Sequence, residues 1–345
     1  MIEINLLTSR DEQKWQKFIQ NSKDSTIYHT LEWKQVLEET YNYKPYYFIA
    51  KENNKIQGIL PSFQIKSFIT GNRLVSLPFS YLGGPIATSD EVMEKLINTA
   101  KNKTNELNCK YLELRVRDEM PELGLFKSDY YIDFSLELSS TEYTWKKLHD
   151  STRRATKKAM RSGVEIVTAN MIDDIRIFHK LEIKTRKKHG LPVRPLRFFE
   201  GIWQGMNPNL ARLLLAKFND EVIAGIILFT FKDTVTYTYG VSDEKYLSYR
   251  PNNLLLWNAI EFGCNNGYDH LDLGRTSPDE RGLVDFKRRW GARGYILPYY
   301  YYPEIPNLTS SNRTDRRYRL LTGFWRKMPS SISKTLGPMV LKRLG

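Results

Sequence analysis

Tyr47-Phe-Ile-Ala-Lys-Glu-Asn-Asn-Lys-Ile-Gln-Gly-Ile-Leu-Pro-Ser-Phe63 and Leu213-Leu-Leu-Ala-Lys-Phe-Asn-Asp-Glu-Val-Ile-Ala-Gly-Ile-Ile-Leu-Phe229 follow one pattern, and this repetition decides the fold. In each segment an apolar run rich in β-formers leads to a short polar step and a second apolar run. The polar steps, Asn53-Asn54 and Asn219-Asp220, suit the tight turn of a β-hairpin. The sequence therefore predicts two related hairpins, one in each half of the chain.

The repetition continues after the hairpins. Cys109-Lys-Tyr-Leu-Glu-Leu-Arg115 parallels Tyr268-Asp-His-Leu-Asp-Leu-Gly-Arg275, and each segment follows a stretch with a helical pattern. Before the first of these strands, Val92, Leu96, Ile97 and Ala100 form a single apolar stripe. Hairpin, helix and strand thus recur in the same order, which predicts a duplicated α/β chain.

Residue 140 is the expected division between the two halves, since 345 residues exceed the roughly 100 to 200 residues of one domain. The segment that follows is rich in Lys and Arg and ends at Gly163, a suitable helix C-cap. We expect four parts: a domain at 1–140, a basic linking helix at 141–162, a second domain at 163–306, and a basic amphipathic tail at 307–345.

The net charge of +13 is concentrated in two places, the linking helix and the tail. From Asn307 onward, nine Lys or Arg residues accompany a single acid, Asp315. This concentration indicates a polyanionic partner, and tRNA, an anionic membrane and phosphorylated substrates all remain open. The tail also mixes bulky apolar and basic residues, as interfacial anchors do. A tail docked on the body of the protein is the other interpretation.

Several classes of protein are not expected. No apolar run approaches the roughly 20 residues of a membrane span, so we expect a cytoplasmic protein whose tail is its candidate contact with a membrane surface. Cys109, Cys264 and five scattered histidines predict neither a disulfide framework nor a metal site. The motifs of serine hydrolases, P-loop enzymes, zinc proteases and dinucleotide-binding proteins are absent.

Three segments of the second half carry a resemblance to a known family. They are Ser248-Tyr-Arg-Pro-Asn-Asn-Leu-Leu-Leu-Trp257, Gly267-Tyr-Asp-His-Leu-Asp-Leu-Gly-Arg-Thr276 and Val284-Asp-Phe-Lys-Arg-Arg-Trp-Gly-Ala292. Together they resemble the Fem-type, FemAB-like aminoacyltransferases, and the order of elements is similar to the GNAT acyltransferase fold. The resemblance implies an α/β fold of two tandem GNAT-like domains, each a mixed twisted sheet flanked by helices.

The resemblance also implies a function. Fem-type enzymes transfer an amino acid from aminoacyl-tRNA to an amine of a cell-envelope precursor, so the expected co-substrate is an aminoacyl-tRNA and no bound cofactor is expected. Phe286-Lys287 resembles the Phe-Lys pair that the family implicates in catalysis or donor binding. Trp33 is a candidate substrate-binding residue, although Trp33-Lys34-Gln-Val departs from the family spacing Trp-Gly-x-x-Lys.

The donor has alternatives. Acetyl-CoA enzymes of the GNAT fold place the loop R/Q-x-x-G-x-G/A at a helix start, where backbone amides hold a pyrophosphate. Here Arg250-Pro-Asn-Asn lacks those glycines, although Asn252 and Asn253 still suit a helix start. Arg250 either contacts a phosphate or remains exposed to solvent. An acyl-CoA or acyl-carrier-protein donor is the second interpretation, and a non-catalytic, membrane-peripheral binding protein is the third.

Two basic side chains are candidates for the reaction itself. Lys287 could donate a hydrogen bond to the oxyanion of an acyl transfer, or it could be one exposed lysine in the run Lys287-Arg288-Arg289. Arg275 follows the strand at 271–274 and is expected at its carboxyl end, where open α/β sheets bind ligands. It could hold a phosphate or carboxylate there, or pair with a nearby acid.

Candidate acceptor residues come from the preceding strand. Tyr237, Tyr239 and Asp243 lie along or just after it, and they could position or deprotonate an amine. Alternating tyrosines on a half-buried strand more often serve packing alone.

Overall fold

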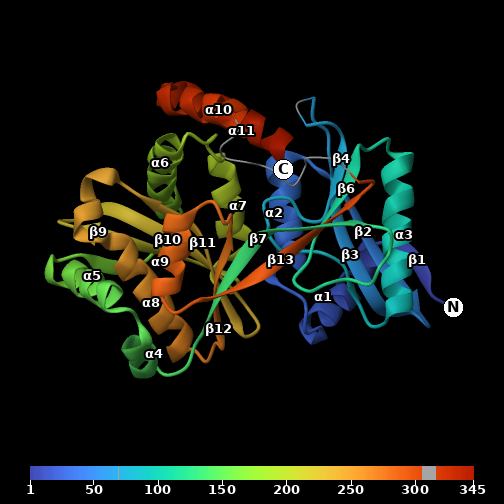
Figure 1. Cartoon of the computed structure of the whole chain (residues 1–345), viewed down its shortest axis with the longest axis horizontal. Helices are drawn as coiled ribbons and strands as arrows, with labels where there is room; N and C mark the ends of the chain where they lie inside the picture. Colours follow the sequence, from blue (N-terminus) through green and yellow to red (C-terminus); the bar gives the residue numbers. More distant parts are fainter. Residues whose placement is uncertain (69, 305–315) are drawn as a thin grey trace. The chain divides into compact units, whose positions relative to one another are not determined.

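Two compact units make up the computed structural model, which describes residues 1–68, 70–304 and 316–345. The first unit contains Met1–Tyr130, the strand from Ile296 onward, and Met339–Gly345. The second contains Tyr131–Tyr295 and the C-terminal helical segment up to Pro338. Each unit is a mixed sheet with helices on its faces (Figure 1).

The sheet of the first unit has the order β1-β2-β3-β4-β6-β13. Its strands are β1 (Glu3–Leu6), β2 (Lys44–Glu52), β3 (Lys55–Ile65), β4 (Arg73–Val75), β6 (Tyr111–Arg115) and β13 (Arg293–Tyr302), with β5 (Ile86–Ala87) beside β3. Neighbours are antiparallel except β4 and β6, which are parallel. The final strand pairs Tyr299–Tyr302 with β6, so this sheet is completed by residues from the second half of the sequence.

The sheet of the second unit repeats this plan in the order β8-β9-β10-β11-β12-β7. Its strands are β8 (Glu165–Thr168), β9 (Ala211–Phe218), β10 (Glu221–Phe231), β11 (Thr234–Ser242), β12 (His270–Thr276) and β7 (Phe126–Glu137). Only β11 and β12 are parallel neighbours among these strands. Here the strand completing the sheet, β7, precedes the others in the sequence.

Both predicted hairpins are confirmed, and the turns form for the expected reason. Asn53 and Asn54 adopt φ of 48° and 62°, and Asn219 and Asp220 adopt the same two values. A two-residue turn with both central φ angles positive matches the twist of the flanking strands, and Asn and Asp tolerate this conformation better than most residues.

Helices cover both faces of each sheet (Figure 1). In the first unit they are α1 (Glu12–Asn21), α2 (Leu31–Tyr41) and α3 (Asp90–Glu106), with short 3-10 turns at Ser9–Asp11 and Ile27–His29. The predicted stripe of α3 is buried: Val92, Leu96, Ile97 and Ala100 pack on β2, β3 and β6. Trp15 of α1 lies against Tyr47 of β2, with ring centroids 5.2 Å apart.

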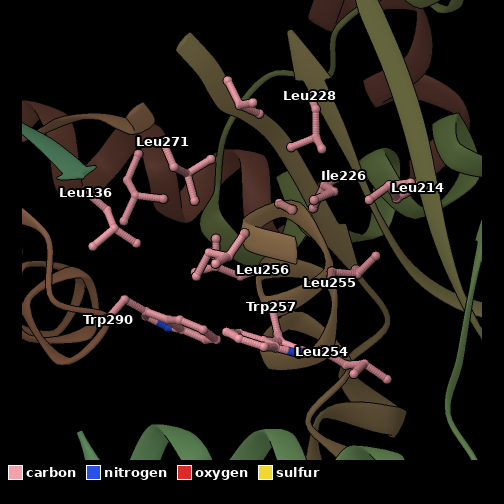
Figure 2. Close-up of a cluster of buried hydrophobic side chains, with 14 of the residues drawn as sticks. Leu136, Leu214, Ile226, Leu228, Leu254, Leu255, Leu256, Trp257, Leu271 and Trp290 are labelled. Carbon is pink, nitrogen blue, oxygen red and sulfur yellow. The ribbon is translucent and has the colours of Figure 1, made fainter. Parts of the chain in front are cut away.

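The second unit has its main core beneath one central helix. Its helices are α4 (Thr141–Lys147), α5 (Asp150–Arg161), α6 (Ile172–His189), α7 (Leu196–Met206), α8 (Pro251–Asn265), α9 (Arg281–Arg289), α10 (Arg316–Lys327) and the part of α11 (Ser330–Leu344) up to Pro338, with a 3-10 helix η3 at Glu244–Tyr249. Figure 2 shows Leu254, Leu255 and Trp257 of α8 among strand residues of this core. The helices α6 and α7 pack together, and α6 also packs on β10 and β11.

The expected linking helix at 141–162 is instead two helices of the second unit. Leu148 interrupts the helix because its backbone is extended, with ψ of 144°, and its side chain is buried. His149 then caps α5 by accepting from the backbone N–H of Ser151. Trp145 of α4 packs on Trp257, with ring centroids 4.5 Å apart. The second unit also begins earlier than the expected division, at Tyr131, and residues 132–137 of β7 pair with β12.

The expected tail begins with residues 307–315, which lie outside the described residues, and continues as α10 and α11. Trp325 and Met328 of α10 are buried. At Gly190, which ends α6 with φ of 65°, an added Cβ would collide with the carbonyl of Thr322. The described tail therefore packs on the body of the protein, with α10 against α6. Within the parts that the structure describes, no helix is long and apolar enough to cross a membrane.

The aromatic centre of the second core allows a test of this packing. Replacing Trp257 by alanine should lower the free energy of unfolding by about 3 to 5 kcal/mol, because it leaves a large cavity between α4, α8 and the sheet. Denaturant unfolding followed by circular dichroism measures this. The half-exposed Met160 on α5 provides a matched control, and Met160→Ala should change stability by less than about 0.5 kcal/mol. Equal effects of the two changes would contradict the assigned core.

Candidate active site

A cavity of about 870 Å³ lies within the second unit at the carboxyl ends of β11 and β12. Its position follows from the sheet. The register pairs of these parallel strands end at Thr236 and Asp272, although β11 continues to Ser242 and β12 to Thr276. Because the strands separate beyond that point, the space between them is open to a ligand. The start of α5, the first turn of α8 and the helix α9 supply the other walls.

Lys287 is the most deeply buried cation of the cavity wall, with 5% of its surface exposed. Its Nζ donates hydrogen bonds to the carbonyl oxygen of Gly274 and to Oγ1 of Thr276, both at 2.6 Å. Nζ also lies 5.3 Å from the ring centroid of Phe134. The interpretation of Lys287 as an exposed lysine in a charged run is therefore wrong: α9 turns Lys287 inward, while Arg288 and Arg289 are exposed.

The backbone conformation of β12 positions the two hydrogen-bond acceptors of Lys287. Gly274 has φ of 72°, a conformation that glycine adopts without steric cost, and it lies where the pairing of β12 with β7 becomes irregular. The carboxylate of Asp272 accepts from the Gly274 N–H at 2.7 Å and fixes this turn. Asp272 therefore has a structural role in the site.

Burial lowers the pKa of Lys287 from 10.5 to about 8, because the ammonium loses its hydration. The negative charges of Asp133, Asp272 and Glu280 oppose this shift without cancelling it. A lysine in this range exchanges its proton near neutral pH, which is a property of groups that act in acid–base chemistry.

Tyr237 and Tyr239, the alternating tyrosines of β11, lie on opposite faces of the strand. Ile226 and Leu228 of β10 pair with Gly240 and Tyr237 of β11, so β11 carries one extra residue between these pairs. This β-bulge reverses the alternation of side chains. Tyr237 consequently lines the cavity, and burial raises its pKa.

Tyr239 is not part of the cavity wall, and the prediction that it contacts the acceptor is wrong. It packs among Phe198, Phe199 and Phe229, with the Arg194 guanidinium 4.7 Å from its ring centroid. Burial raises the pKa of Tyr239 to about 12. Its surroundings are those of a core residue.

Asp243 is likewise not a cavity residue, so the structure contradicts its prediction as the base. Its carboxylate caps η3 by accepting from the Lys245 N–H at 3.1 Å, and it accepts from Nζ of Lys184 at 2.5 Å. Burial alone would raise its pKa, but these hydrogen bonds lower the pKa below its ordinary value. A carboxylate stabilised in this way is a poor proton acceptor.

Trp33, predicted to bind substrate, is fully buried in α2 of the first unit. Its ring lies against Tyr28, with centroids 5.4 Å apart. That prediction is therefore wrong for the structure as described. The Phe286 side chain, in contrast, is half-buried in the cavity wall and lies 6.2 Å from the ring centroid of Trp290.

Polar and cationic residues surround the cavity at the edge of the sheet. Arg275, at the end of β12, is exposed and stacks over Tyr131 at 4.2 Å from its ring centroid. Arg250 has φ of 61° at the start of α8, and the next turn brings Asn252 and Asn253 to the cavity. Arg250, Asn252 and Asn253 therefore line the same cavity as Arg275, and their binding of a phosphate or carboxylate stays a prediction.

Sequence reasoning missed part of the wall. Ser151 and Thr152 at the start of α5 and Thr185 near the end of α6 line the cavity, and so does His189. The signal available was the run Asp150-Ser-Thr152, which is typical of a helix start and argues against a continuous helix there. In the described part of the chain, no cluster of His, Cys, Asp or Glu could hold a metal ion.

Comparison with known proteins gives sequence similarity in the second half. A family model described as an acetyltransferase (GNAT) domain matches residues 146–288. The chain is also similar to the UDP-N-acetylmuramoylpentapeptide-lysine N(6)-alanyltransferase of Weissella viridescens, with 22% identity over 123 residues. This match covers 36% of each chain, so the alignment spans about a third of that relative.

Solved structures extend the likeness to most of the fold. FemX has a TM-score of 0.68 at 14% identity, covering 86% of this chain and 96% of its own. A lysylphosphatidylglycerol synthetase C-terminal domain from Agrobacterium fabrum has a TM-score of 0.59 at 11% identity, with coverages of 86% and 93%. A tandem GNAT protein of clavulanic acid biosynthesis has a TM-score of 0.58 at 9% identity, with coverages of 87% and 98%.

Together these findings confirm the predicted α/β fold of two tandem GNAT-like units. They also confirm the resemblance to Fem-type aminoacyltransferases that the sequence motifs indicated.

The depressed pKa of Lys287 predicts a specific pH dependence of stability. Between about pH 8 and pH 10.5 the unfolded chain holds a proton on this lysine that the folded chain has released, so the stability contributed by Lys287 rises with pH. The free energy of unfolding of the wild type relative to Lys287→Met should therefore increase across that window, by up to about 3 kcal/mol. Urea unfolding of both proteins at pH 7.5 to 10 measures the difference, and a constant difference would contradict a shifted pKa.

Proposed function

We propose that this protein transfers an aminoacyl or acyl group from an activated carrier to an amine of a cell-envelope precursor, with aminoacyl-tRNA as the preferred donor. The observation that carries the proposal is the placement of buried Lys287 in the wall of a large cavity at the carboxyl ends of two separating strands. Similarity to a muramoylpentapeptide-lysine alanyltransferase supports an amine of an envelope precursor as the acceptor.

The cavity wall suits such a transfer. The donor carbonyl reaches Lys287, while Phe286, Leu256 and Leu273 form an apolar wall that excludes water from the reacting groups. At the rim, Arg275 and Arg250 hold the phosphate or carboxylate groups of the substrates. Tyr237 lies in the wall contributed by β11 and contacts the bound substrate. Positioning of two substrates in one site accounts for a large share of such a rate enhancement.

A tRNA donor is supported by the surface beside the cavity. The outer side of α4 and α5 carries exposed cations, and the first turn of α5 reaches the cavity. This basic face consists of Lys146, Lys147, Arg154, Lys157, Lys158 and Arg161. Its charge attracts phosphates of an RNA whose aminoacylated end enters the cavity.

Acyl-CoA and acyl carrier protein remain the alternative donors. Arg250-Pro-Asn-Asn begins α8 without the glycines that allow a pyrophosphate to approach the backbone closely. The first-turn amides of α8 nevertheless favour an anionic group. This arrangement favours a donor held mainly by side chains and by the basic face.

Charged total tRNA with a labelled amino acid should support transfer to an envelope-precursor extract, and ribonuclease should abolish it. Lys157→Glu with Lys158→Glu should raise the KM for the tRNA at least about tenfold, because two phosphate contacts become repulsions. Glu142→Gln, which changes charge on α4 without removing a cation, is the matched control. Transfer from labelled acetyl-CoA alone would move the protein to the alternative donor class, and transfer from no donor would reject an enzymatic role.

The proposal places this reaction in the cytoplasm, with the C-terminal helices in contact with an anionic membrane face. On α11, Ile332 and Leu336 are exposed one helical turn apart, and Lys334 between them is exposed as well. Residues 316–345 include no acid. An apolar stripe with flanking cations suits the interface of anionic lipid better than it suits a purely polar partner.

Vesicles test this contact directly. The full-length protein should sediment with vesicles that contain about one third phosphatidylglycerol and much less with neutral vesicles. Ile332→Ser with Leu336→Ser should reduce binding at least about tenfold, since the variant loses two exposed apolar side chains that would enter the lipid interface. The control Met160→Ser removes an exposed apolar side chain elsewhere on the unit. Unchanged vesicle binding of the double variant would reject the membrane contact.

A further inference from the structure

The wall that α6 contributes to the cavity ends in a loop, residues 190–194, that the C-terminal helices cover. Thr185 and His189 line the cavity, and the chain turns directly after them at Gly190, which has φ of 65°. The Leu191 N–H donates to a carbonyl oxygen in the last turn of α6 at 2.9 Å, as in a Schellman-type helix end. The position of His189 in the wall therefore depends on how this loop is held.

Helix α10 packs on the first residue of the loop. A Cβ added at Gly190 would lie 2.9 Å from the carbonyl carbon of Thr322 and closer still to the carbonyl oxygen. Backbone therefore approaches backbone, and this contact has little room to adjust. The side chains of Trp325 and Met328 are buried and anchor α10 in this position.

Helix α11 packs on the same loop at a second point. A Cβ added at Gly337 would lie 2.6 Å from the backbone nitrogen of Val193 and 2.7 Å from its carbonyl oxygen. Gly337 lies inside a helix, where alanine is more favourable than glycine. The close approach of Val193 accounts for a glycine at this position. Ser333, one turn earlier on α11, is buried as well.

Side chains of α6 bind the loop from the other side. Nε of Arg186 donates to the Pro192 carbonyl oxygen at 2.9 Å, and Nε2 of His179 donates to that of Arg194 at 2.8 Å. The Arg194 guanidinium pairs at 2.8 Å with Glu182, which is buried. The loop is thus enclosed between α6 and the C-terminal helices, and its backbone is held from both sides.

The end of α6 is also joined to another wall of the cavity. The Ser242 N–H donates to Oγ1 of Thr185 at 3.0 Å, and Nζ of Lys184 pairs with Asp243 at 2.5 Å. Ser242 and Asp243 lead into η3, which ends at Arg250 in the cavity wall. A shift of the end of α6 would therefore change two walls of the cavity at once.

From these contacts we infer that α10 and α11 position His189 to bind the donor, with Gly190 and Gly337 as the positioning residues. Because His189 directly precedes the enclosed loop, the packing of both helices fixes where its imidazole lies in the wall. An imidazole N–H there donates to a phosphate or carbonyl oxygen of the donor. The inference rests on the proposed function and deepens it, because it makes the C-terminal helices part of the donor site as well as a membrane contact.

Two glycine substitutions in the C-terminal helices form a matched pair. Gly337→Ala places a methyl group against the Val193 backbone, whereas a Cβ at Gly323 of α10 would meet no described atom within 4 Å. Gly337→Ala should raise the KM for charged tRNA at least about tenfold and change kcat less than about twofold, because a donor contact is lost while the reacting groups stay in place. Gly323→Ala should change neither value.

A double-mutant cycle separates positioning from a general loss of stability. His189 is exposed, so His189→Ala disturbs no core, and it should raise the same KM by a similar factor. The double variant Gly337→Ala with His189→Ala should be no worse than His189→Ala alone, because both changes remove one contact. Effects that multiply would overturn the assignment of Gly337 to His189.

Hydrogen exchange gives a readout that needs no donor. The amides of the loop 190–194 should exchange at least about tenfold faster in Gly337→Ala and at the wild-type rate in Gly323→Ala, as measured by mass spectrometry. Equal exchange in the two variants, or equal KM values, would overturn the inference and leave the transferase proposal intact. If the wild type transfers from no donor, the proposed function fails, whereas faster loop exchange limited to Gly337→Ala would still establish that α11 holds the loop.

Discussion

The separation of two parallel strands is the constraint on which the site depends. Where β11 and β12 diverge after Thr236 and Asp272, backbone groups lose their ladder partners, and buried polar groups must find others. The Gly274 carbonyl is one of them, and it accepts from Lys287. The same gap forms the cavity. One side chain, Lys287, therefore both provides a hydrogen bond to a backbone carbonyl that has no strand partner and is the reactive group of the proposed site.

The repeated hairpins, the α3 stripe and the duplicated order of elements could be predicted from the sequence, because each depends on local pattern and turn chemistry. The inward position of Lys287 was compatible with the family motif, but the sequence left it open. Tyr239 and Asp243 were misassigned for a physical reason. A β-bulge depends on how two strands pair, so the sequence of β11 alone does not reveal that Tyr237 and Tyr239 lie on opposite faces. Asp243 was predicted to be a base because its partner could not be seen in the sequence: Lys184 comes from α6, 59 residues away.

A basic composition also concealed a break in structure. The many Lys and Arg residues of segment 141–162 led to the prediction of one solvent-exposed helix. In the structure α4 ends at the buried Leu148, and His149 caps the start of α5. That break brings the α5 start, rather than a helix side, to the cavity. The charge of a segment indicates which partners its surface attracts. It does not show where a helix ends, which here coincides with the buried apolar residue Leu148.

Each sheet is completed by a strand from the opposite half of the sequence, and this has a consequence for how the protein is made. Residues 131–295 of the second unit are contiguous, so its sheet can close while the nascent chain is still attached to the ribosome. The first unit is different, because β6 can pair with β13 only after β13 has been synthesised. Until Tyr299–Tyr302 emerge, the first unit presents an open strand edge of the kind that invites mispairing. The part of the protein translated first is therefore the part that finishes last, and it has the greater need of a chaperone in the interval.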